Sequence, residues 1–448
     1  LSPAERYAHW LRVRNGQAPI VIGARSAVFA PLTHIGLIIV DEEHEASYKH
    51  SSEPTYHARE LAIARAQAEN AVLVLGSATP SLESFYRAEQ GVLKRLDLPE
   101  RVGQTSLPSV EIVDMRGAKF QILTAPLLSA LQETVSAGYQ AILFLNRRGY
   151  APFLLCRECG YVPMCPNCSV SLTYHRVDTF ALRCHHCGHQ ARPPSSCPRC
   201  RGVQIAPFGV GTQRVEQFLR EHLPHLRVAR LDRDVLSGWE QFLEVLRAFR
   251  AGELDVLVGT QVVARGLDFP RVMLVGVISA DMGLRLPDFR ASERTFQLLM
   301  QVAGRTGRRE NQGRVIIQTY CPDHPAIRCV QTHDYERFYR YEMAIRREPL
   351  YPPYCRLVNL LATHENPNVA ESLLNRLLTL LHEDASLLQI LGPVPAPLER
   401  LEGRYRYHML LKFAPSAEPA EQLEPILHTL TPRERRWVQV DIDPLTLV

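Results

Sequence analysis

Eight of the eleven cysteines in this 448-residue chain stand in four Cys-x-x-Cys pairs. The pairs are Cys156/Cys159, Cys165/Cys168, Cys184/Cys187 and Cys197/Cys200. Each pair can present two thiolates to one tetrahedral zinc ion, so four pairs predict two four-thiolate sites. A segment this short cannot bury a sizeable core, and we therefore expect metal binding to supply its folding free energy.

Two pairings of these cysteines fit the spacing. In the nested pairing, which we favour, the outer two pairs hold one ion and the inner two pairs hold the other. In the sequential pairing, successive pairs share an ion. Iron–sulfur ligation and redox cysteines are alternatives, but four regular pairs favour structural zinc in a reducing compartment, the cytoplasm. The isolated Cys321, Cys329 and Cys355 are expected to be core residues.

Outside this segment, short β-rich runs alternate with helical stretches, which is typical of α/β units around a parallel sheet. Strands are predicted at 37–40, 72–75, 141–145, 255–258, 272–277 and 314–317, and helices from about 293 and over 326–347. Several strands run directly into polar turns. Ligands of open α/β sheets bind beyond the carboxyl ends of the strands, so chemistry is expected at these turns.

The fold class predicted from this pattern is α/β, with two parallel-sheet lobes. The expected divisions are a partial first lobe (1–100), a linker (101–112), a second lobe (113–155 and 204–322), its Cys-rich two-zinc insertion (156–203) and an α+β C-terminal domain (323–448). The chain starts with Leu1, and its first residues have the periodicity of a helix within a domain. We therefore expect a fragment of a longer protein.

Two polar turns lie in the first lobe. Residues 41–44 (Asp-Glu-Glu-His) follow a predicted strand, where Asp41 can hold Mg²⁺ while Glu42 orients and deprotonates an attacking water. In the segment 76–80 (Gly-Ser-Ala-Thr-Pro), Thr79 is predicted to cap a helix that begins at Pro80.

Two more segments lie in the second lobe. Residues 301–308 (QVAGRTGR) are predicted to end a helix and to carry Arg305 and Arg308 on one face, where they could reach phosphates. A solvated basic helix end is the structural alternative. Residues 259–270 (GTQVVARGLDFP) form a turn whose N–H groups could contact a nucleic-acid phosphate, with Asp268 sensing the nucleotide. An ordinary strand-to-helix turn is the alternative there.

In this order, the segments 23–31, 41–44, 76–81, 259–270 and 301–308 resemble the motifs of superfamily-2 helicases. With the insertion that follows 146–150, the chain resembles the PriA family of bacterial primosomal replication-restart helicases over essentially its whole length, including 391–395 and 441–444. The resemblance implies two RecA-like lobes in an enzyme that unwinds DNA 3′ to 5′ with ATP at abandoned replication forks. It also implies a role in reloading the replicative helicase.

The resemblance also implies roles for single residues. Asp41 and Glu42 are implied as the magnesium and water-activating pair, and His44 couples hydrolysis to DNA. The implied ATP site further includes Gly266, Asp268, Gln301, Arg305 and Arg308. DNA contact or coupling is implied for Arg25, Tyr48, Tyr56, His57, Arg59, Ser77, Thr79, Thr260 and Gln261. The aromatic-rich stretch 48–59 resembles a loop that senses single-stranded DNA, since bases can stack on its rings; local packing of these aromatics is the alternative.

The implied cofactors are two Zn²⁺ ions, ATP and Mg²⁺. The implied partners are forked and single-stranded DNA, the single-stranded DNA-binding protein and primosome loader proteins. A monomer without membrane association is expected, and no apolar run approaches the ~18 residues needed to cross a bilayer.

One motif of the class is absent. The sequence contains no GxxxxGK[ST] segment and no Gly-Lys pair, so this polypeptide alone is expected to have negligible ATPase activity. A second hypothesis is a non-catalytic DNA-binding, partner-recruiting scaffold, but a scaffold has no need to retain the residues of 41–44 and 301–308. A third, an RNA helicase with a zinc ribbon, gives no reason for the C-terminal segment.

Overall fold

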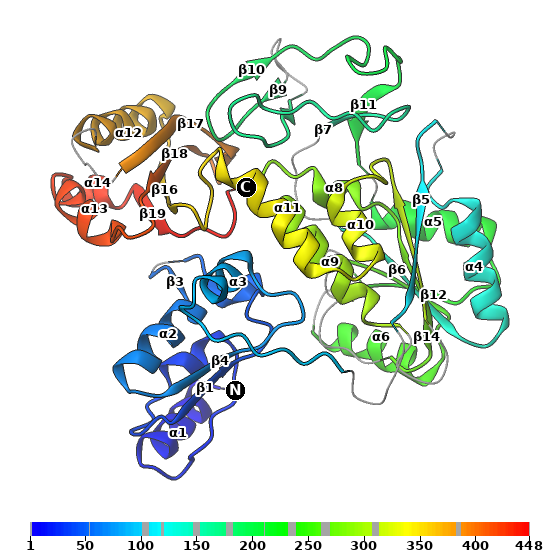
Figure 1. The fold of residues 1–448 in the computed structure, drawn as a ribbon, viewed down its shortest axis with the longest axis horizontal. Coiled ribbons are helices and arrows are strands. Elements are labelled where there is room, and N and C mark those ends of the chain that lie inside the picture. Colours follow the sequence, from blue (N-terminus) through cyan, green and yellow to red (C-terminus); the bar gives the residue numbers. More distant parts are fainter. Residues whose placement is uncertain are drawn as a thin grey trace. The chain divides into compact units, whose positions relative to one another are not determined.

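The computed structural model describes residues 2–52, 54–100, 107–117, 121–146, 153–175, 182–209, 211–231, 239–260, 269–306, 313–381 and 387–447. The chain divides into two compact units. The first unit contains Leu1–Arg95, Tyr351–Pro393 and Arg400–Leu447, and the second contains Leu96–Leu350 and Val394–Glu399. Each unit combines helices with sheets, which confirms the α/β prediction (Figure 1).

A six-stranded sheet with the order β12-β13-β6-β14-β15-β5 forms the centre of the second unit, and all its neighbouring strands are parallel. The strands are β5 (Ser109–Asp114), β6 (Gln140–Phe144), β12 (Val228–Leu231), β13 (Val256–Gly259), β14 (Val272–Val277) and β15 (Arg314–Thr319). Parallel strands need crossover connections. The crossover helices are α4 (Ala125–Ser136), α5 (Thr212–His222), α6 (Trp239–Ala251), α8 (Asp281–Leu284) and α9 (Ala291–Ala303).

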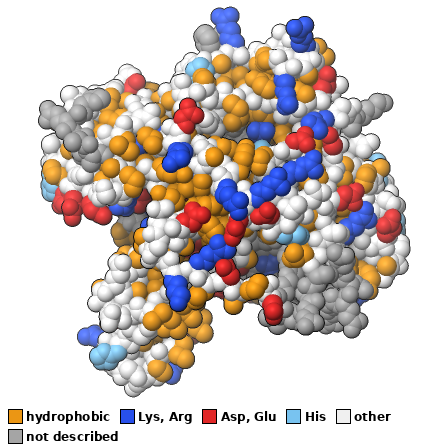
Figure 2. Space-filling view, viewed as in Figure 1, with side chains coloured by type: hydrophobic (Ala, Val, Ile, Leu, Met, Phe, Trp, Pro, Cys, Tyr) orange, Lys and Arg blue, Asp and Glu red, His pale blue; other side chains and the backbone are white. Residues whose placement is uncertain are grey.

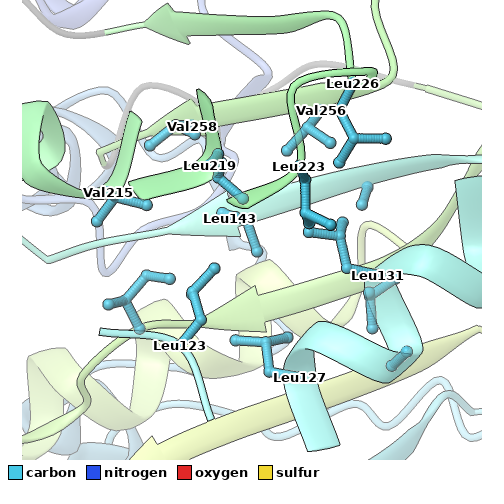
Figure 3. Close-up of a cluster of buried hydrophobic side chains, with 14 of the residues drawn as sticks. Leu123, Leu127, Leu131, Leu143, Val215, Leu219, Leu223, Leu226, Val256 and Val258 are labelled. Carbon is cyan, nitrogen blue, oxygen red and sulfur yellow. The ribbon is translucent and has the colours of Figure 1, made fainter. Parts of the chain in front are cut away.

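The main core of this unit lies between the sheet and helices α4 and α5 (Figure 3). Leu127 and Leu131 of α4 and Leu219 of α5 pack there against strand residues that include Leu143 and Val258. Complete burial of such a side chain contributes roughly 1.5–3 kcal/mol. Helices α9, α10 (Pro325–Gln331) and α11 (Tyr335–Arg347) lie on the opposite side of the sheet in Figure 1. The sheet is therefore covered on both faces, which explains the continuous apolar runs in its strands.

The first part of the first unit contains two parallel strands, β1 (Leu37–Val40) and β4 (Val72–Leu75). Around them stand α1 (Pro3–Arg14), η1 (Arg25–Phe29), η2 (Ala46–Tyr48), β2 (Lys49–His50), β3 (Tyr56–His57), α2 (Ala58–Ala68) and α3 (Leu82–Glu89). Helix α2 packs against both strands. The alternate strand residues are solvent-exposed, with 64% exposure at Ile39 and 61% at Val72. Hydrophobic side chains are visible on the molecular surface in Figure 2.

The C-terminal part of the first unit is a four-stranded sheet with the order β17-β18-β16-β19. Its elements are β16 (Arg356–His364), α12 (Pro367–Leu381), β17 (Leu387–Leu401), β18 (Arg404–Phe413), α13 (Pro419–His428), α14 (Pro432–Arg435) and β19 (Val438–Ile442). β16 is antiparallel to both β18 and β19. This antiparallel sheet with helices confirms the α+β class predicted for the C-terminal region. Among the described residues, no helix combines the length and apolar character needed to span a membrane.

Two predicted boundaries differ from the structure. The helix predicted over 326–347 is two helices, α10 (Pro325–Gln331) and α11 (Tyr335–Arg347). The break occurs because His333 adopts a positive φ of 53° and the Asp334 side chain caps α11 by accepting the N–H of Arg337. The predicted linker 101–112 overlaps β5, which starts at Ser109 and pairs with β15.

Helices α9 and α11 are joined by buried charges. Arg346 of α11 is only 1% exposed and lies 2.7 Å from the carboxylate of Glu293 on α9 and 3.5 Å from that of Glu342. Arg290 also approaches Glu293, at 3.4 Å. Burial raises the pKa of Glu342. Because these groups are removed from water together, the loss of one partner leaves an opposite charge uncompensated.

We therefore expect Arg346→Met to lower the free energy of unfolding by about 3–5 kcal/mol. The change is measured by urea denaturation monitored in the second unit. Arg340→Met is the matched control, because Arg340 lies on the same helix but is 75% exposed beside Glu336. Its loss should cost at most about 1 kcal/mol. Equal effects of the two substitutions would contradict a stabilising role for the buried network.

Candidate functional sites

The acidic turn 41–44 follows directly after β1, in the first unit. Asp41 and Glu42 are exposed, and the Glu42 N–H donates to the Asp41 carboxylate over 3.0 Å. Glu42 has a positive φ of 47°, a conformation that costs of order 1–3 kcal/mol in a non-glycine residue. The Tyr48 hydroxyl donates to the Asp41 carbonyl over 2.8 Å. The turn thus presents two neighbouring carboxylates to solvent from a backbone that its surroundings hold in place.

The buried carboxylate of Glu43 holds this turn in place through hydrogen bonds. It is 1% exposed, and its carboxylate accepts bonds from the Ser81 N–H (2.6 Å), the Ser81 hydroxyl (3.1 Å) and the Ser84 hydroxyl (2.9 Å). Arg59 lies 2.8 Å from the same carboxylate. The Glu43 N–H donates to the Gly76 carbonyl over 3.1 Å. Glu43 was not among the predicted site residues, although its carboxylate beside Glu42 is visible in the sequence as a signal.

His44 joins the acidic turn to the segment after β4. Its Nδ1 atom lies 2.7 Å from the Ser77 hydroxyl, and its side chain is 4% exposed. The Ser77 hydroxyl also accepts the Thr79 N–H over 3.0 Å. The helix start predicted here is wrong: α3 begins at Leu82, with Ser81 rather than Thr79 as its N-cap. The reason is that Ser81 accepts the N–H of Ser84 while Glu43 holds the Ser81 backbone.

The contacts of His57 and Arg59 are inside the protein. His57 caps α2 by accepting the Arg59 N–H, and Arg59 is 7% exposed between Glu43 and Glu60. Burial alone would raise the pKa of Glu60, but Arg59 and Arg87 lower that pKa to about 2. His57 and Arg59 were predicted as DNA-contact or coupling residues. The structure gives Arg59 a buried bridging position between two carboxylates, and its role in DNA contact or coupling stays a prediction.

Strands β2 and β3 pair as a short antiparallel hairpin within the aromatic-rich stretch. The Tyr56 ring packs on Phe29 and His50 with centroid separations of 5.1 Å, and Arg25 lies 5.8 Å above it. Arg25 also donates to the Lys49 carbonyl over 2.7 Å. Local packing of these aromatics, the structural alternative, is therefore present. Tyr56 and Tyr48 nevertheless keep partial exposure, and burial followed by the charge of Asp41 raises the pKa of Tyr48.

The second unit contains the remaining predicted ATP-site and coupling residues. Thr260 follows β13 directly, and Gln301 lies in the last turn of α9. Helix α9 ends at Ala303, so Arg305 lies in the turn beyond it, with its N–H bonded to the Val302 carbonyl over 3.1 Å. The prediction that Arg305 and Arg308 share a helical face stays a prediction, because Arg308 lies outside the described residues. The predicted residues Gln261, Gly266, Asp268 and Arg308 lie outside the described part of the chain.

The eight paired cysteines form two separate groups of four. One group is Cys156, Cys159, Cys197 and Cys200, and the other is Cys165, Cys168, Cys184 and Cys187. Within each group, all sulfur atoms lie within 4.8 Å of one another. This grouping corresponds to the nested pairing and not to the sequential one.

The sulfur separations fit zinc. The Sγ–Sγ distances are 3.7 Å for Cys156/Cys200, 3.5 Å for Cys159/Cys197 and 3.6 Å for Cys165/Cys187. Four sulfurs placed tetrahedrally at about 2.3 Å from Zn²⁺ lie about 3.8 Å apart. None of the eight cysteines is in a disulfide. The two clusters therefore support two zinc ions, with four thiolates each.

Each Cys-x-x-Cys turn is closed in the same way. The residue after the second cysteine donates its N–H to the carbonyl of the first cysteine in all four turns. These residues all have positive φ values, namely Gly160 (74°), Ser169 (53°), Gly188 (77°) and Arg201 (62°). Glycine adopts this conformation at no steric cost, and it stands at two of the four positions. The CxxCG pattern at 156–160 and 184–188 is therefore a sequence signal for this turn.

The base of the insertion packs on the parallel-sheet lobe. Strands β7 (Phe153–Cys156) and β11 (Ile205–Phe208) pair antiparallel, and Phe153 and Phe208 share a core with Tyr320. A Cβ atom on Gly160 would overlap the Tyr320 carbonyl. Three two-residue strands, β8 (Thr173–Tyr174), β9 (Leu182–Arg183) and β10 (Gln190–Ala191), form the insertion's other sheet. Because these strands are so short, we expect the metal clusters to contribute most of the stability of the insertion.

Three models of known families match the chain in sequence order. They are the PriA DNA helicase Cys-rich region domain at 165–192, the helicase conserved C-terminal domain at 201–310 and the primosomal protein N C-terminal domain at 347–445. The parallel sheet, the conserved helicase domain and the two four-cysteine clusters define the class as helicase-type proteins with a Cys-rich insertion.

The relatives specify the family. The replication restart protein PriA of Bacillus subtilis is 46% identical over 99% of this chain and 56% of its own length. The replication restart protein PriA of Treponema pallidum is 42% identical over 100% of this chain and 68% of its own length. This chain belongs to the PriA family of replication restart proteins.

The match to the relatives is partial in length. The chain spans about half to two thirds of the relatives it matches, with 56% and 68% for the two above. Among solved structures, RecG bound to a three-way DNA junction covers 77% of this chain and 35% of its own, at 15% identity. The TM-score of that comparison is 0.39.

Proposed function

We propose that this chain forms most of the motor of an ATP-dependent 3′–5′ DNA helicase of replication restart. It would act on stalled or abandoned forks and promote primosome assembly through single-stranded DNA-binding protein and loader proteins. Membership of the PriA family and the match to a helicase C-terminal domain support this function. The observation that carries the proposal is the acidic turn, whose buried Glu43 and His44 connect its exposed Asp41 and Glu42 to the segment after β4.

The proposed chemistry follows from the donor set. Asp41 would hold Mg²⁺, which shields the phosphate charges of bound ATP, and Glu42 would orient the attacking water and accept its proton. Gln301, Arg305 and Arg308 would contact the nucleotide, together with Gly266 and Asp268. Thr260 and Gln261 would contact the DNA backbone.

Coupling to DNA would run through the hydrogen bonds of the acidic turn. A shift of Ser77 would move His44 through the 2.7 Å hydrogen bond between the Ser77 hydroxyl and His44 Nδ1. A shift of Tyr48 would move Asp41 through the 2.8 Å hydrogen bond to the Asp41 carbonyl. Both contacts end next to Glu42, so a shift caused by DNA would alter the orientation of the general base. His44, Ser77 and Thr79 are therefore proposed as coupling residues, with Tyr48 and Tyr56 as the rings that meet single-stranded DNA.

ATP turnover also needs a loop that cradles the phosphates and supplies a lysine. This sequence has no such segment, so we propose that the polypeptide alone hydrolyses ATP negligibly. The activity tests below therefore use a protein in which this chain is joined to a family phosphate loop. Negligible turnover by the polypeptide by itself, measured with single-stranded DNA present, is the expected result.

In that protein, Ser77→Ala should lower the ratio of DNA-stimulated to DNA-independent ATP hydrolysis by roughly tenfold. The reason is that a hydrogen bond to a group that can carry charge contributes about 1.5–3 kcal/mol. Steady-state hydrolysis with and without single-stranded DNA measures this ratio. Ser129→Ala is the control, because this serine is exposed on α4 in the second unit. An unchanged ratio in Ser77→Ala would refute the coupling route.

The substrate is tested by unwinding of forked DNA and of duplex RNA under the same conditions. We expect ATP-dependent unwinding of forked DNA with a 3′ single-stranded arm. Equal unwinding of RNA would favour the RNA-helicase hypothesis. DNA binding without any unwinding would favour the scaffold hypothesis.

A further inference from the structure

The hairpin formed by β2 and β3 is bonded to strand β19 of the C-terminal sheet, far along the chain. The Thr55 hydroxyl donates to the Val440 carbonyl over 3.3 Å, and the Gln439 side chain donates to the Ser51 carbonyl over 2.9 Å. β19 is an edge strand, paired only with β16 in the sheet order. An edge strand has backbone groups available for another segment, and here the hairpin uses them.

Lys49 makes the central contact of this junction. Its Nζ atom lies 2.7 Å from the Asp441 carboxylate, and it donates to the Ile442 carbonyl over 2.6 Å and to the Asp443 carbonyl over 3.3 Å. An ammonium group has three N–H donors, so β19 and the residue after it can satisfy all three. The Lys49 side chain is only 8% exposed and that of Asp441 21% exposed. Removal of one partner from such a mostly buried pair leaves the other charge uncompensated, which costs more than the loss of a surface pair.

The same residue is connected to the acidic turn. The Lys49 carbonyl accepts a bond from Arg25, and its neighbour Tyr48 donates to the Asp41 carbonyl over 2.8 Å. Lys49 thus follows Tyr48 in the chain, and Tyr48 bonds directly to Asp41 of the proposed magnesium and water-activating pair. A displacement of Lys49 relative to β19 must move Tyr48, because the two residues share a peptide bond.

We infer that Lys49 is a positioning residue that β19 holds through Asp441, so that the C-terminal sheet sets the placement of the aromatic hairpin relative to the acidic turn. This inference rests on the proposed function for its consequence in DNA-dependent hydrolysis. The physical junction itself is independent of that function. The C-terminal sheet then acts on the motor by holding the element that meets DNA.

The junction is tested first by hydrogen exchange on the chain itself. Lys49→Met and Asp441→Asn should each raise the exchange rate of the β2 and β3 amides at least several-fold. The double variant should match Lys49→Met, because Asp441→Asn breaks a contact that Lys49→Met has already removed. Lys412→Met is the matched control, since Lys412 is also a buried lysine of the first unit but contacts the Tyr351 ring and donates to the Gln389 side chain. Hairpin exchange equal to wild type in Lys49→Met, or additive effects in the double variant, would overturn the junction.

The positioning role is tested in the protein that carries the phosphate loop. Lys49→Met should raise the DNA concentration for half-maximal stimulation of ATP hydrolysis about tenfold. Lys412→Met should leave that concentration unchanged. Faster hairpin exchange with unaltered DNA dependence would overturn the positioning role. Tyr56→Ala separates the two proposals: if it too leaves DNA dependence unaltered, the hairpin's DNA-sensing function fails, whereas the exchange result on the junction stands.

Discussion

Replacement of Cys165 with serine is expected to reduce the zinc content of the chain from two ions to one and to disorder the insertion around β8, β9 and β10. The reason is energetic, because binding of a structural zinc ion contributes about 10–16 kcal/mol and the short strands bury little else. Elemental analysis measures the stoichiometry, and limited proteolysis of the insertion measures the loss of order. Cys329→Ser is the matched control, since Cys329 is buried in α10 outside both clusters. It should keep both ions.

Paired substitutions separate the two arrangements of ligands. In the nested arrangement, Cys156→Ser with Cys197→Ser damages one cluster, so one ion remains, whereas Cys156→Ser with Cys165→Ser damages both. In the sequential arrangement these two outcomes are exchanged. A double variant at Cys156 and Cys197 that retains no zinc, beside one at Cys156 and Cys165 that retains one ion, would refute the nested clusters.

Glu42→Gln is expected to reduce ATP hydrolysis by about 10²–10⁴-fold in the protein that carries the phosphate loop, because the amide cannot accept the proton of the attacking water. Nucleotide and DNA binding should persist, since the neighbouring Asp41 is unchanged. Single-turnover hydrolysis and equilibrium binding separate these quantities. The surface variant Glu69→Gln, at the end of α2, is the control and should hydrolyse ATP at the original rate.

Glu43→Gln distinguishes catalysis from architecture at the same turn. Glu43 is buried and paired with Arg59, so its neutralisation should lower the melting temperature, whereas Glu42 is exposed and its substitution should not. Hydrolysis retained in Glu42→Gln, with protein of normal stability, would remove Glu42 from the role of general base.

Features that depend on neighbouring residues in the chain were predicted well. Strands β1, β4 and β14 occupy the predicted ranges, because their apolar runs between polar turns are local signals. The four Cys-x-x-Cys turns could likewise be predicted from the spacing of their own cysteines. Helix ends were predicted less well. The cap at Ser81 depends on Glu43, 38 positions earlier, and no local pattern contains that contact.

The burial of individual charged side chains could not be predicted from the sequence either. Arg59 was predicted to contact DNA or to couple hydrolysis to it because the stretch 48–59 resembles a loop that senses single-stranded DNA. It is buried because α2 directs it toward Glu43 and Glu60, and a periodicity argument does not identify the partners of a charged residue in the interior. The same holds for Arg346, which lies within a helix that reads as strongly polar.

The sequence by itself determined the α/β class, the presence of two four-cysteine zinc clusters and the family, because each follows from residue types at fixed short spacings. Only the tertiary structure decided which cysteine pairs share a cluster, which carboxylate of the acidic turn is buried and which is exposed, and that Lys49 meets Ile442, 393 positions away. These outcomes depend on how separate elements pack and exclude water. Burial and long-range pairing are properties of the packed chain, and local patterns do not specify them.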